Sequence, residues 1–243
     1  MGTPYLIVAL DVETFEQAKS LIDELSDVVD IFKIGSQLFT AYGPFVTRYV
    51  QSKGKKVFLD LKFHDIPNTV ASAVKSAVGL SVPPANDQGF APLFMLTVHT
   101  QGGLEMLQAA VKTAKEQAQK LGVTKPLIIG VTVLTSDQRT ADLAGTVLSR
   151  AKLAKEAGLD GVVASVEEAA MIRKNLGTDF VIVTPGIRPA GAEVGDQKRV
   201  ATPALAIESG SNYLVVGRPI VQAQSPRQAA LNILAELQTK GRS

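Results

Sequence analysis

Short apolar runs rich in valine and isoleucine alternate with longer polar segments along the whole chain. The runs lie at residues 5–11, 29–35, 56–61, 94–100, 127–135, 161–165, 180–186 and 213–217. Buried parallel strands read as near-continuous apolar runs, and each needs a crossover, usually a helix, before the next parallel strand. Eight such units in 243 residues have the size and rhythm of a (β/α)8 barrel. The sequence therefore predicts an α/β protein with one TIM-barrel domain, residues 1–243.

Segments with apolar residues at helical spacing separate the runs. The clearest are 14–25, 102–120 and 225–238, and weaker ones lie near 37–53, 66–79, 141–157 and 167–175. A doubly wound sheet shows the same alternation, but a dinucleotide-binding sheet of that kind has a glycine-rich turn after its first strand. Here the first run continues into ALDVETF, residues 9–15, so the barrel is the favoured fold.

Two segments interrupt the repeat. Residues 79–93, GLSVPPANDQGFAPL, carry proline, glycine and asparagine, and we expect them to form an insertion before strand four. Residues 184–203, TPGIRPAGAEVGDQKRVATP, form a long connection after strand seven. Long loops in compact domains are often functional, and barrels commonly bind phosphate after strands seven and eight. We therefore expect residues 184–203 to close over a bound phosphate.

The composition of the chain bears on which partners it can bind and in which cellular compartment it works. The 25 basic and 23 acidic side chains leave a net charge of +2, and no block of like charge predicts a nucleic-acid partner. The N-terminal MGTPYLIVALDVETF has acids after a short apolar run, which is typical of neither a signal peptide nor a membrane anchor. The chain has no cysteine, which excludes thiolate chemistry and fits a reducing compartment. We expect a soluble cytoplasmic protein with no membrane partner.

Charged residues gather where three neighbouring strands are expected to end. Strand one ends in Asp11, strand two carries Lys33 near its end, and strand three ends with Asp60 and Lys62. Asp60 and Lys62 share one face because side chains alternate along a strand. The carboxyl ends of the strands form the catalytic mouth of a barrel, so this pattern predicts an electrostatic site there.

Ordinary structural roles compete for some of these residues. Asp65 precedes Ile66 and Pro67 and is a natural helix N-cap, while Asp11 or Lys33 alone could form a rim salt bridge. His64 and His99 are the two histidines, and a hydrogen-bonded structural role suits them better than metal ligation because further ligands are not evident.

Several motifs together carry a resemblance to a known family. FLDLKFHDIPNTV at 58–70 resembles the signature of the orotidine 5′-monophosphate decarboxylases. The motifs VALDV, FKIG, TVH, GVTVLTS, TPGIRP and VVGRPI follow in the order expected for that family over essentially the whole chain. The resemblance implies conversion of orotidine 5′-monophosphate to uridine 5′-monophosphate and CO2 in pyrimidine biosynthesis, on a barrel, without a metal or organic cofactor.

The resemblance also assigns roles to residues. It implies an alternating network of Lys33, Asp60, Lys62 and Asp65, in which Lys62 donates the proton and Asp65 reaches into the partner's site of a homodimer. For binding the substrate, it implies that Asp11 and Lys33 contact the ribose, that Thr135 and Gln197 contact the pyrimidine side, and that Thr69 also takes part.

The phosphate site has candidates of its own. Arg188 follows strand seven and Arg218 follows strand eight, the region in which barrels bind phosphate. A guanidinium group can hold a phosphate through two parallel hydrogen bonds, and Gly217 allows the backbone to approach closely.

Four other functions remain possible for this sequence. A metal-dependent keto-gulonate-phosphate decarboxylase or an epimerase could use the same barrel, and would lose activity in EDTA. A Schiff-base aldolase needs a neutral Lys62, which flanking carboxylates disfavour. A catalytically silent nucleotide-binding protein would bind uridylate and release no CO2, and the intact charged set argues against it.

Overall fold

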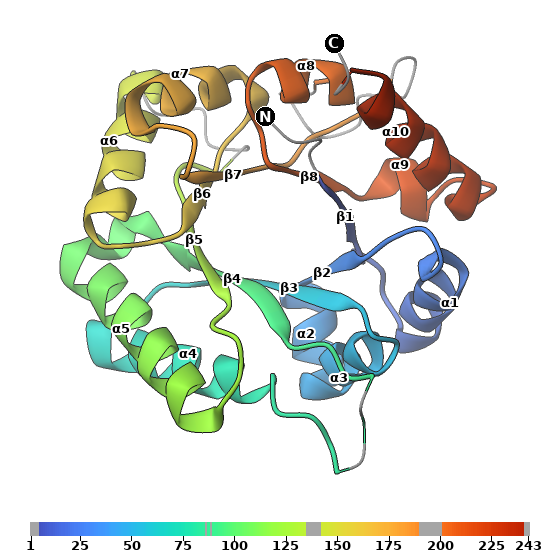
Figure 1. Cartoon of the computed structure of the whole chain (residues 1–243), viewed down its shortest axis with the longest axis horizontal. Helices are drawn as coiled ribbons and strands as arrows, with labels where there is room; N and C mark the ends of the chain where they lie inside the picture. Colours follow the sequence, from blue (N-terminus) through green and yellow to red (C-terminus); the bar gives the residue numbers. More distant parts are fainter. Residues whose placement is uncertain (1–4, 86, 88, 135–141, 190–200, 241–243) are drawn as a thin grey trace.

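Eight parallel strands close into a barrel in the computed structural model of the chain (Figure 1). The structure describes residues 5–85, 87, 89–134, 142–189 and 201–240. The strands are β1 Tyr5–Ala9, β2 Ile31–Gly35, β3 Lys56–Phe63, β4 Leu93–His99, β5 Leu127–Val131, β6 Gly161–Val163, β7 Val181–Thr184 and β8 Tyr213–Val216. Each strand pairs in parallel with its neighbour in sequence, and β1 pairs with β8 to close the sheet. The predicted (β/α)8 barrel is confirmed.

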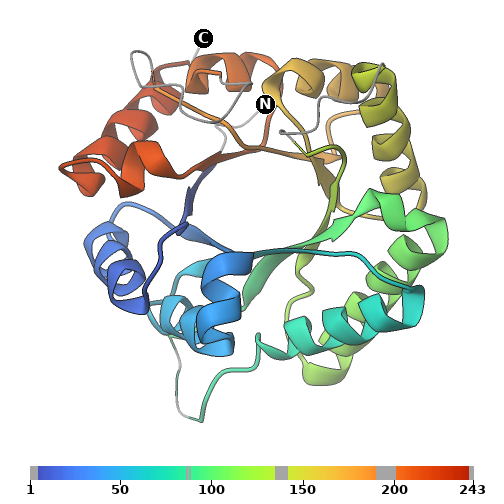
Figure 2. The ribbon, with the colours of Figure 1, turned by 180° about the vertical axis from the view of Figure 1, so that it is seen from behind.

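Helices form an outer ring around the strands, as the view from behind also shows (Figure 2). The helices are α1 Phe15–Leu25, α2 Ser36–Tyr42, α3 Pro44–Ser52, α4 Pro67–Gly79, the 3-10 turn η1 Thr100–Gly102, α5 Gly103–Leu121, α6 Leu143–Glu156, α7 Val166–Leu176, α8 Pro203–Glu208, α9 Arg218–Val221 and α10 Pro226–Lys240. The expected single helix near 37–53 is two helices. Gly43 between them has φ 55°, a left-handed conformation that glycine adopts without strain, and Pro44 then starts α3.

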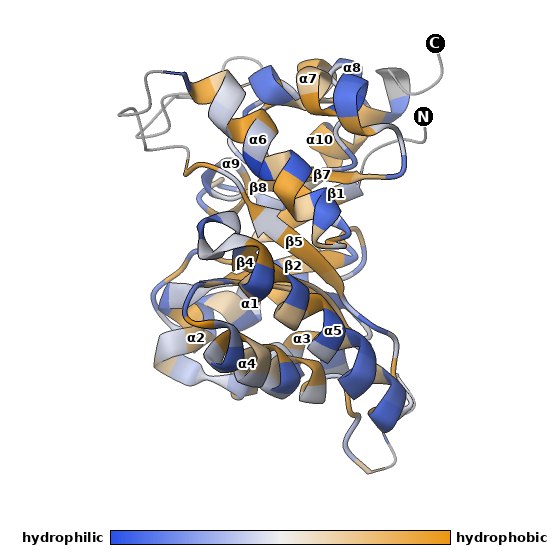
Figure 3. Cartoon of the chain, turned by 90° about the vertical axis from the view of Figure 1, so that its left-hand side faces the viewer, coloured by the Kyte–Doolittle hydropathy of each residue, from blue (hydrophilic) through white to orange (hydrophobic). Residues whose placement is uncertain are grey.

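Apolar residues pack in two clusters on the two faces of the sheet. The larger lies between the sheet and the helices, and the hydrophobic strands stand at the centre of the molecule in Figure 3. The smaller fills the barrel interior with Ile7, Ala9, Ile31, Phe58, Met95, Ile129, Val183 and Val215. Because inward-facing side chains plug the barrel, as in other proteins of this fold, a ligand can bind only above this plug.

The segment expected as an insertion connects α4 to β4. It contacts the end of α3 through Gln51. The side chain of Gln51 donates from Nε2 to the Leu80 carbonyl at 3.0 Å, and the backbone carbonyl of Gln51 accepts from the Ala91 N–H at 3.1 Å. A helix-to-strand connection lies at the amino ends of the strands, which is the face opposite to the mouth. The segment therefore sits away from the end of the barrel that carries the charged residues.

The segment after β7 is held together at its base. Ile187 forms a parallel bridge with Ala201, and the Arg188 backbone donates to the Ala201 carbonyl at 2.9 Å. Residues 190–200 between these ends lie outside the described part of the chain. Among the helices that the structure describes, none is long and apolar enough to cross a membrane.

Candidate active site

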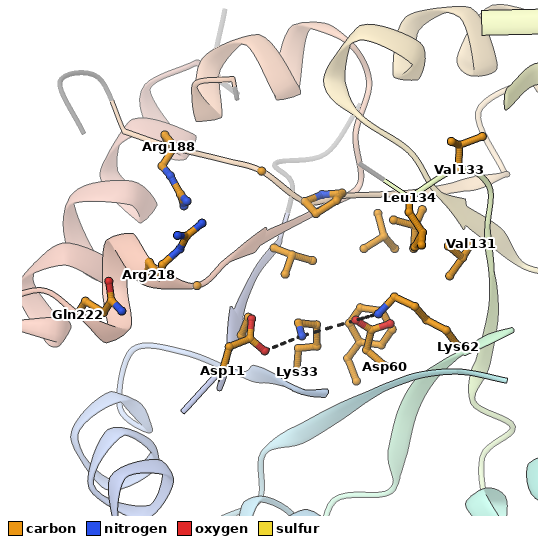
Figure 4. A pocket seen from close by; sticks show the side chains of 18 residues that line it. Asp11, Lys33, Asp60, Lys62, Val131, Val133, Leu134, Arg188, Arg218 and Gln222 are labelled. Atoms are coloured by element: carbon orange, nitrogen blue, oxygen red, sulfur yellow. Dashed lines mark hydrogen bonds and ion pairs between the residues drawn. The ribbon is translucent and has the colours of Figure 1, made fainter. Parts of the chain in front are cut away.

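A cavity of about 450 Å³ opens above the plug, at the carboxyl ends of the strands (Figure 4). Its lining comes from the ends of β1, β2, β3, β5, β6, β7 and β8 and from the segments that follow them. Three kinds of wall meet in it: a row of charged groups, an aliphatic surface and a pair of arginines. The cavity occupies the position where barrel enzymes carry their active sites.

The charged row consists of Asp11, Lys33, Asp60 and Lys62, as the sequence predicts. Lys33 donates from Nζ to Oδ1 of Asp11 at 3.0 Å and lies 3.5 Å from Oδ2 of Asp60. Lys62 donates from its own Nζ to the same Oδ2 of Asp60 at 2.8 Å. The signs therefore alternate along the row, and Figure 4 shows these contacts along one wall. Gly35 matters here, since a Cβ at that position would lie 3.2 Å from Lys33 Nζ.

Asp60 is the most enclosed carboxylate of the row, with 12% of its side chain exposed. Burial alone would raise its pKa, and this is the largest single influence. The ammonium groups of Lys33 and Lys62, with hydrogen bonds from Lys62 and Thr97, outweigh burial and bring the pKa of Asp60 below its ordinary value. The two ammonium groups therefore favour the ionised form of Asp60 although its side chain is largely buried.

The backbone at Lys62 departs from a regular strand. Its φ is +51°, the one positive φ among the described non-glycine residues. The pairing of β3 with β4 shifts register between Leu59 and Phe63, which is the signature of a bulge, and bulges often re-aim a side chain beside an active site. The simple alternation that placed Asp60 and Lys62 on one face missed this bulge, although both side chains do line the cavity.

The arginine pair lies at the opposite end of the cavity from Lys62. Arg188 follows β7, Arg218 begins α9, and their guanidinium groups both point into the cavity (Figure 4). Gly217 precedes Arg218 and also lines the cavity. A Cβ there would meet protein atoms no nearer than 3.6 Å, an ordinary contact distance. The space around Gly217 would admit a Cβ, but its backbone, with φ −110° and ψ −104°, lies outside the regions that residues with a Cβ ordinarily adopt.

An aliphatic wall completes the cavity. It includes Val131, Val133, Leu134, Val163 and Pro185, and Leu134 has 44% of its surface exposed at the rim. No sequence pattern marks these residues as part of a site, because valine and leucine in or next to a barrel strand are typical of ordinary core. The wall offers a flat organic ring an apolar surface within the same cavity as the charged row.

Asp65 and Thr69 lie elsewhere. In the described part of the chain both are exposed and neither lines the cavity. The capping role considered for Asp65 is wrong: Ile66 is the N-cap of α4 without a side-chain cap bond. Asp65 accepts from the adjacent Ile66 N–H at 2.6 Å, which precedes the helix. Of the other expected binding residues, Thr135 and Gln197 lie outside the described residues.

The two histidines stack on each other beside the mouth, with ring centroids 5.3 Å apart. His99 accepts at Nδ1 from the backbone of Gln101 at 3.3 Å. Burial, followed by the nearby charges of His64, Arg150 and Lys62, lowers the pKa of His99. Within the described residues, no three histidine, aspartate or glutamate side chains group in a way that could hold a metal ion. His99 therefore has the buried, hydrogen-bonded environment of a structural residue, whereas His64 is exposed and contacts it by stacking.

The barrel and its cavity define an enzyme of the (β/α)8 class with a row of charged side chains at the carboxyl ends of its strands. Comparison with known proteins makes this specific, because a profile of the orotidine 5′-phosphate decarboxylase / HUMPS family matches residues 4–233. The chain belongs to this family.

Individual relatives match over nearly the full length. An orotidine 5′-phosphate decarboxylase of Moorella thermoacetica is 48% identical over 96% of this chain and 92% of its own, and one of Vibrio cholerae is 47% identical over 93% and 95%. The crystal structure of the enzyme named orotidine 5′-phosphate decarboxylase from Lactobacillus acidophilus superposes with a TM-score of 0.79 at 36% identity, covering 96% of this chain and 99% of that one.

Proposed function

We propose that this chain decarboxylates orotidine 5′-monophosphate to uridine 5′-monophosphate and CO2, a step of pyrimidine biosynthesis. The observation that carries the proposal is the row in which Lys33 and Lys62 flank Asp60 at 3.5 and 2.8 Å. Loss of CO2 from C6 of the pyrimidine leaves a carbanion with no adjacent π-system aligned to delocalise it. An electrostatic environment fixed in advance is the help that side chains can give, and this row is such an environment.

The substrate spans the cavity from one wall to the other. Its phosphate lies between Arg188 and Arg218, where guanidinium forks match phosphate oxygens. The ribose hydroxyls contact Asp11 and Lys33, and the pyrimidine rests against the aliphatic wall. Thr135 and Gln197 contact the pyrimidine side, and the segment 184–203 closes over the phosphate, so that binding energy remote from the reaction assembles the site.

Asp60 and Lys62 carry out the chemistry. Asp60 lies beside the substrate carboxylate, and its repulsion ends as CO2 departs. The bond from C6 to the carboxyl carbon breaks, the electron pair stays on C6, and the ammonium of Lys62 stabilises that charge before it transfers a proton to C6. The amine of Lys62, now neutral, regains a proton from solvent after product release. Lys33 holds Asp60 ionised throughout.

A second subunit completes the site in this proposal. Asp65 and Thr69 are exposed near the mouth and lie outside the cavity of their own subunit. In a homodimer they enter the partner's site, where Asp65 extends the alternating row beyond Lys62. The exposed Ile66, with 65% of its surface accessible, lies between them in sequence and supplies apolar surface for such a contact.

The site needs neither a metal nor an organic cofactor in this mechanism, because each step is assigned to a side chain. The test is a decarboxylation assay on orotidine 5′-monophosphate after extensive chelation, followed by the loss of orotate absorbance. Full activity in EDTA supports the proposal. Activity that chelation abolishes points to the metal-dependent sugar-phosphate decarboxylases, and uridylate binding without CO2 release points to a silent nucleotide-binding protein. We place the enzyme in the cytoplasm, with no nucleic-acid partner.

A further inference from the structure

A buried threonine stands behind the charged row, at a position where the barrel otherwise uses apolar residues. Thr97 lies on β4 with no accessible surface. It follows Met95 by two residues and pairs in register with Ile129, and both of these belong to the apolar plug of the barrel. Alternation along the strand therefore points Thr97 inward, just above the plug. A hydroxyl that is removed from water at this position needs hydrogen-bond partners.

Both partners of Thr97 belong to the charged row. Its Oγ1 donates to Oδ1 of Asp60 at 3.0 Å and accepts from the backbone N–H of Lys62 at 2.8 Å. A hydroxyl has one proton, and the amide of Lys62 can only donate, so the direction of both bonds is fixed. The two carboxylate oxygens of Asp60 are then distinguished: Oδ1 accepts from Thr97, and Oδ2 faces Lys33 and Lys62.

The second bond meets the irregular backbone of β3. Leu59 pairs with Leu96 and Phe63 pairs with Val98, so four steps along β3 face two steps along β4. Thr97 is the single residue of β4 between those two pairs. The amide of Lys62, whose φ is +51°, finds its acceptor in the side chain of Thr97 instead of in a regular strand ladder. The same hydroxyl thus ties down the orientation of Asp60 and the bulge that aims Lys62.

We propose that Thr97 is a positioning residue of the decarboxylation, and that its hydroxyl acts through Asp60 and Lys62 without touching the substrate. This inference rests on the proposed function. Thr97 is remote from the arginine pair, so its loss should lower kcat and leave the phosphate-dependent affinity for nucleotide unchanged. If Thr97 only packed the barrel, its substitution would not lower kcat while leaving nucleotide affinity unchanged.

Thr97→Val tests the proposal, because valine has nearly the same shape and lacks the hydroxyl. We expect kcat to fall on the order of 10- to 100-fold, since a hydrogen bond to a charged group is lost at the reacting centre. The dissociation constant for uridine 5′-monophosphate should stay within about threefold of the wild type. Thr97→Ser retains the hydroxyl and should restore kcat to within about threefold.

Thr47→Val is the matched control. Thr47 is equally buried, and its hydroxyl donates to the carbonyl of Pro44 at 2.7 Å within α3, away from the cavity. Its kcat should equal that of the wild type within about twofold. If Thr97→Val does not fold, Thr97→Ala also removes the hydroxyl, demands less space and carries the same expectations.

Three kinetic or binding results would each overturn the proposal. They are a kcat of the valine variant within about twofold of wild type, a loss of uridylate affinity as large as the loss of kcat, and a serine variant as slow as the valine variant. Crystal structures keep the test separate from the proposed function, since they need no activity. In Thr97→Val the carboxylate of Asp60 should rotate or Lys62 should leave its left-handed conformation. If the Asp60 carboxylate and the Lys62 backbone both keep their wild-type positions, the positioning role of Thr97 is refuted. If the wild-type protein does not decarboxylate orotidylate, only the proposed function is refuted.

Discussion

Replacing Asp60 by asparagine tests the charged row at its centre, because asparagine keeps the shape and removes the charge. At an effective dielectric constant of 20, the attraction of Asp60 to Lys62 at 2.8 Å and to Lys33 at 3.5 Å amounts to about 6 and about 5 kcal/mol. Desolvation of the carboxylate offsets most of this. Lys33 keeps Asp11 as a partner, and Lys62, with 39% of its side chain exposed, is partly solvated. We therefore expect a net loss in unfolding free energy of about 1–3 kcal/mol.

The loss of stability should depend on pH. The folded-state pKa of Asp60 is below its ordinary value, so the stability that this carboxylate contributes is fully present above the unfolded pKa of about 4. It is lost as the pH falls through the folded pKa. Thermal unfolding of the wild type and of Asp60→Asn should therefore differ by several degrees at pH 7, and the difference should shrink as the pH is lowered from 4. A gap that stays constant over this range would refute the assignment of the stabilisation to the ionised carboxylate.

Activity should respond far more strongly than stability. In Asp60→Asn we expect kcat to fall at least on the order of 10² to 10³-fold, because the repulsion on the substrate carboxylate and the partner of Lys62 both disappear. Asp160→Asn is the control: Asp160 pairs with Lys125 at 2.6 Å at the amino ends of the strands, away from the cavity. That variant should lose stability without losing kcat. An Asp60→Asn enzyme with kcat within threefold of wild type would show that the row serves the fold alone.

Three further variants probe the remaining parts of the site. Lys62→Ala should abolish turnover by several orders of magnitude and leave the fold intact, as judged by circular dichroism; near-normal turnover would remove Lys62 from the chemistry. Arg218→Ala should raise KM steeply and change kcat less, and an unchanged KM would place the phosphate elsewhere. Asp65→Asn should leave the melting temperature within about 1 °C, because Asp65 caps no helix, yet lower kcat; mixing it with Lys62→Ala subunits should restore up to half of the sites. Verified subunit exchange with no returning activity would exclude shared sites.

The sequence was sufficient for the fold and for the charged row because both depend on periodicity. Eight apolar runs in alternation with helical segments leave few other architectures, and the expected strands all form. Several of the apolar runs extend beyond the carboxyl ends of the strands that form within them. The fifth, for example, was expected to reach Thr135, but β5 ends at Val131. Apolar residues continue beyond these strands into the cavity wall, so hydrophobicity alone cannot mark where a barrel strand ends.

The features that the sequence did not reveal depend on exceptions to periodicity. The bulge at Lys62 has no signal in residue type, since a lysine with positive φ looks like any other lysine. Thr97 was part of a motif that supported the resemblance, but its role follows only from its two hydrogen bonds. Asp65 looked like a helix cap because it precedes a proline, and the actual cap position is one residue later. Such details are set by three-dimensional contacts that no local pattern encodes.

The charged row and the arginine pair come from different parts of the barrel. This separation explains how the electrostatic field of the row can be in place before substrate binds. Lys33, Asp60 and Lys62 lie on β2 and β3, and Asp11 follows β1. These strands are paired in register through Ala9, Lys33 and Phe58. The arginines come from the segments after β7 and β8. Under the proposed function, the substrate extends from the arginine pair to the charged row, which lie at opposite ends of the cavity in Figure 4. Charges held on paired strands need little reorganisation when a carbanion forms. Under the proposed function, we expect adjustment on substrate binding at the arginine pair, because Arg188 and Arg218 lie outside the paired strands that carry Lys33, Asp60 and Lys62.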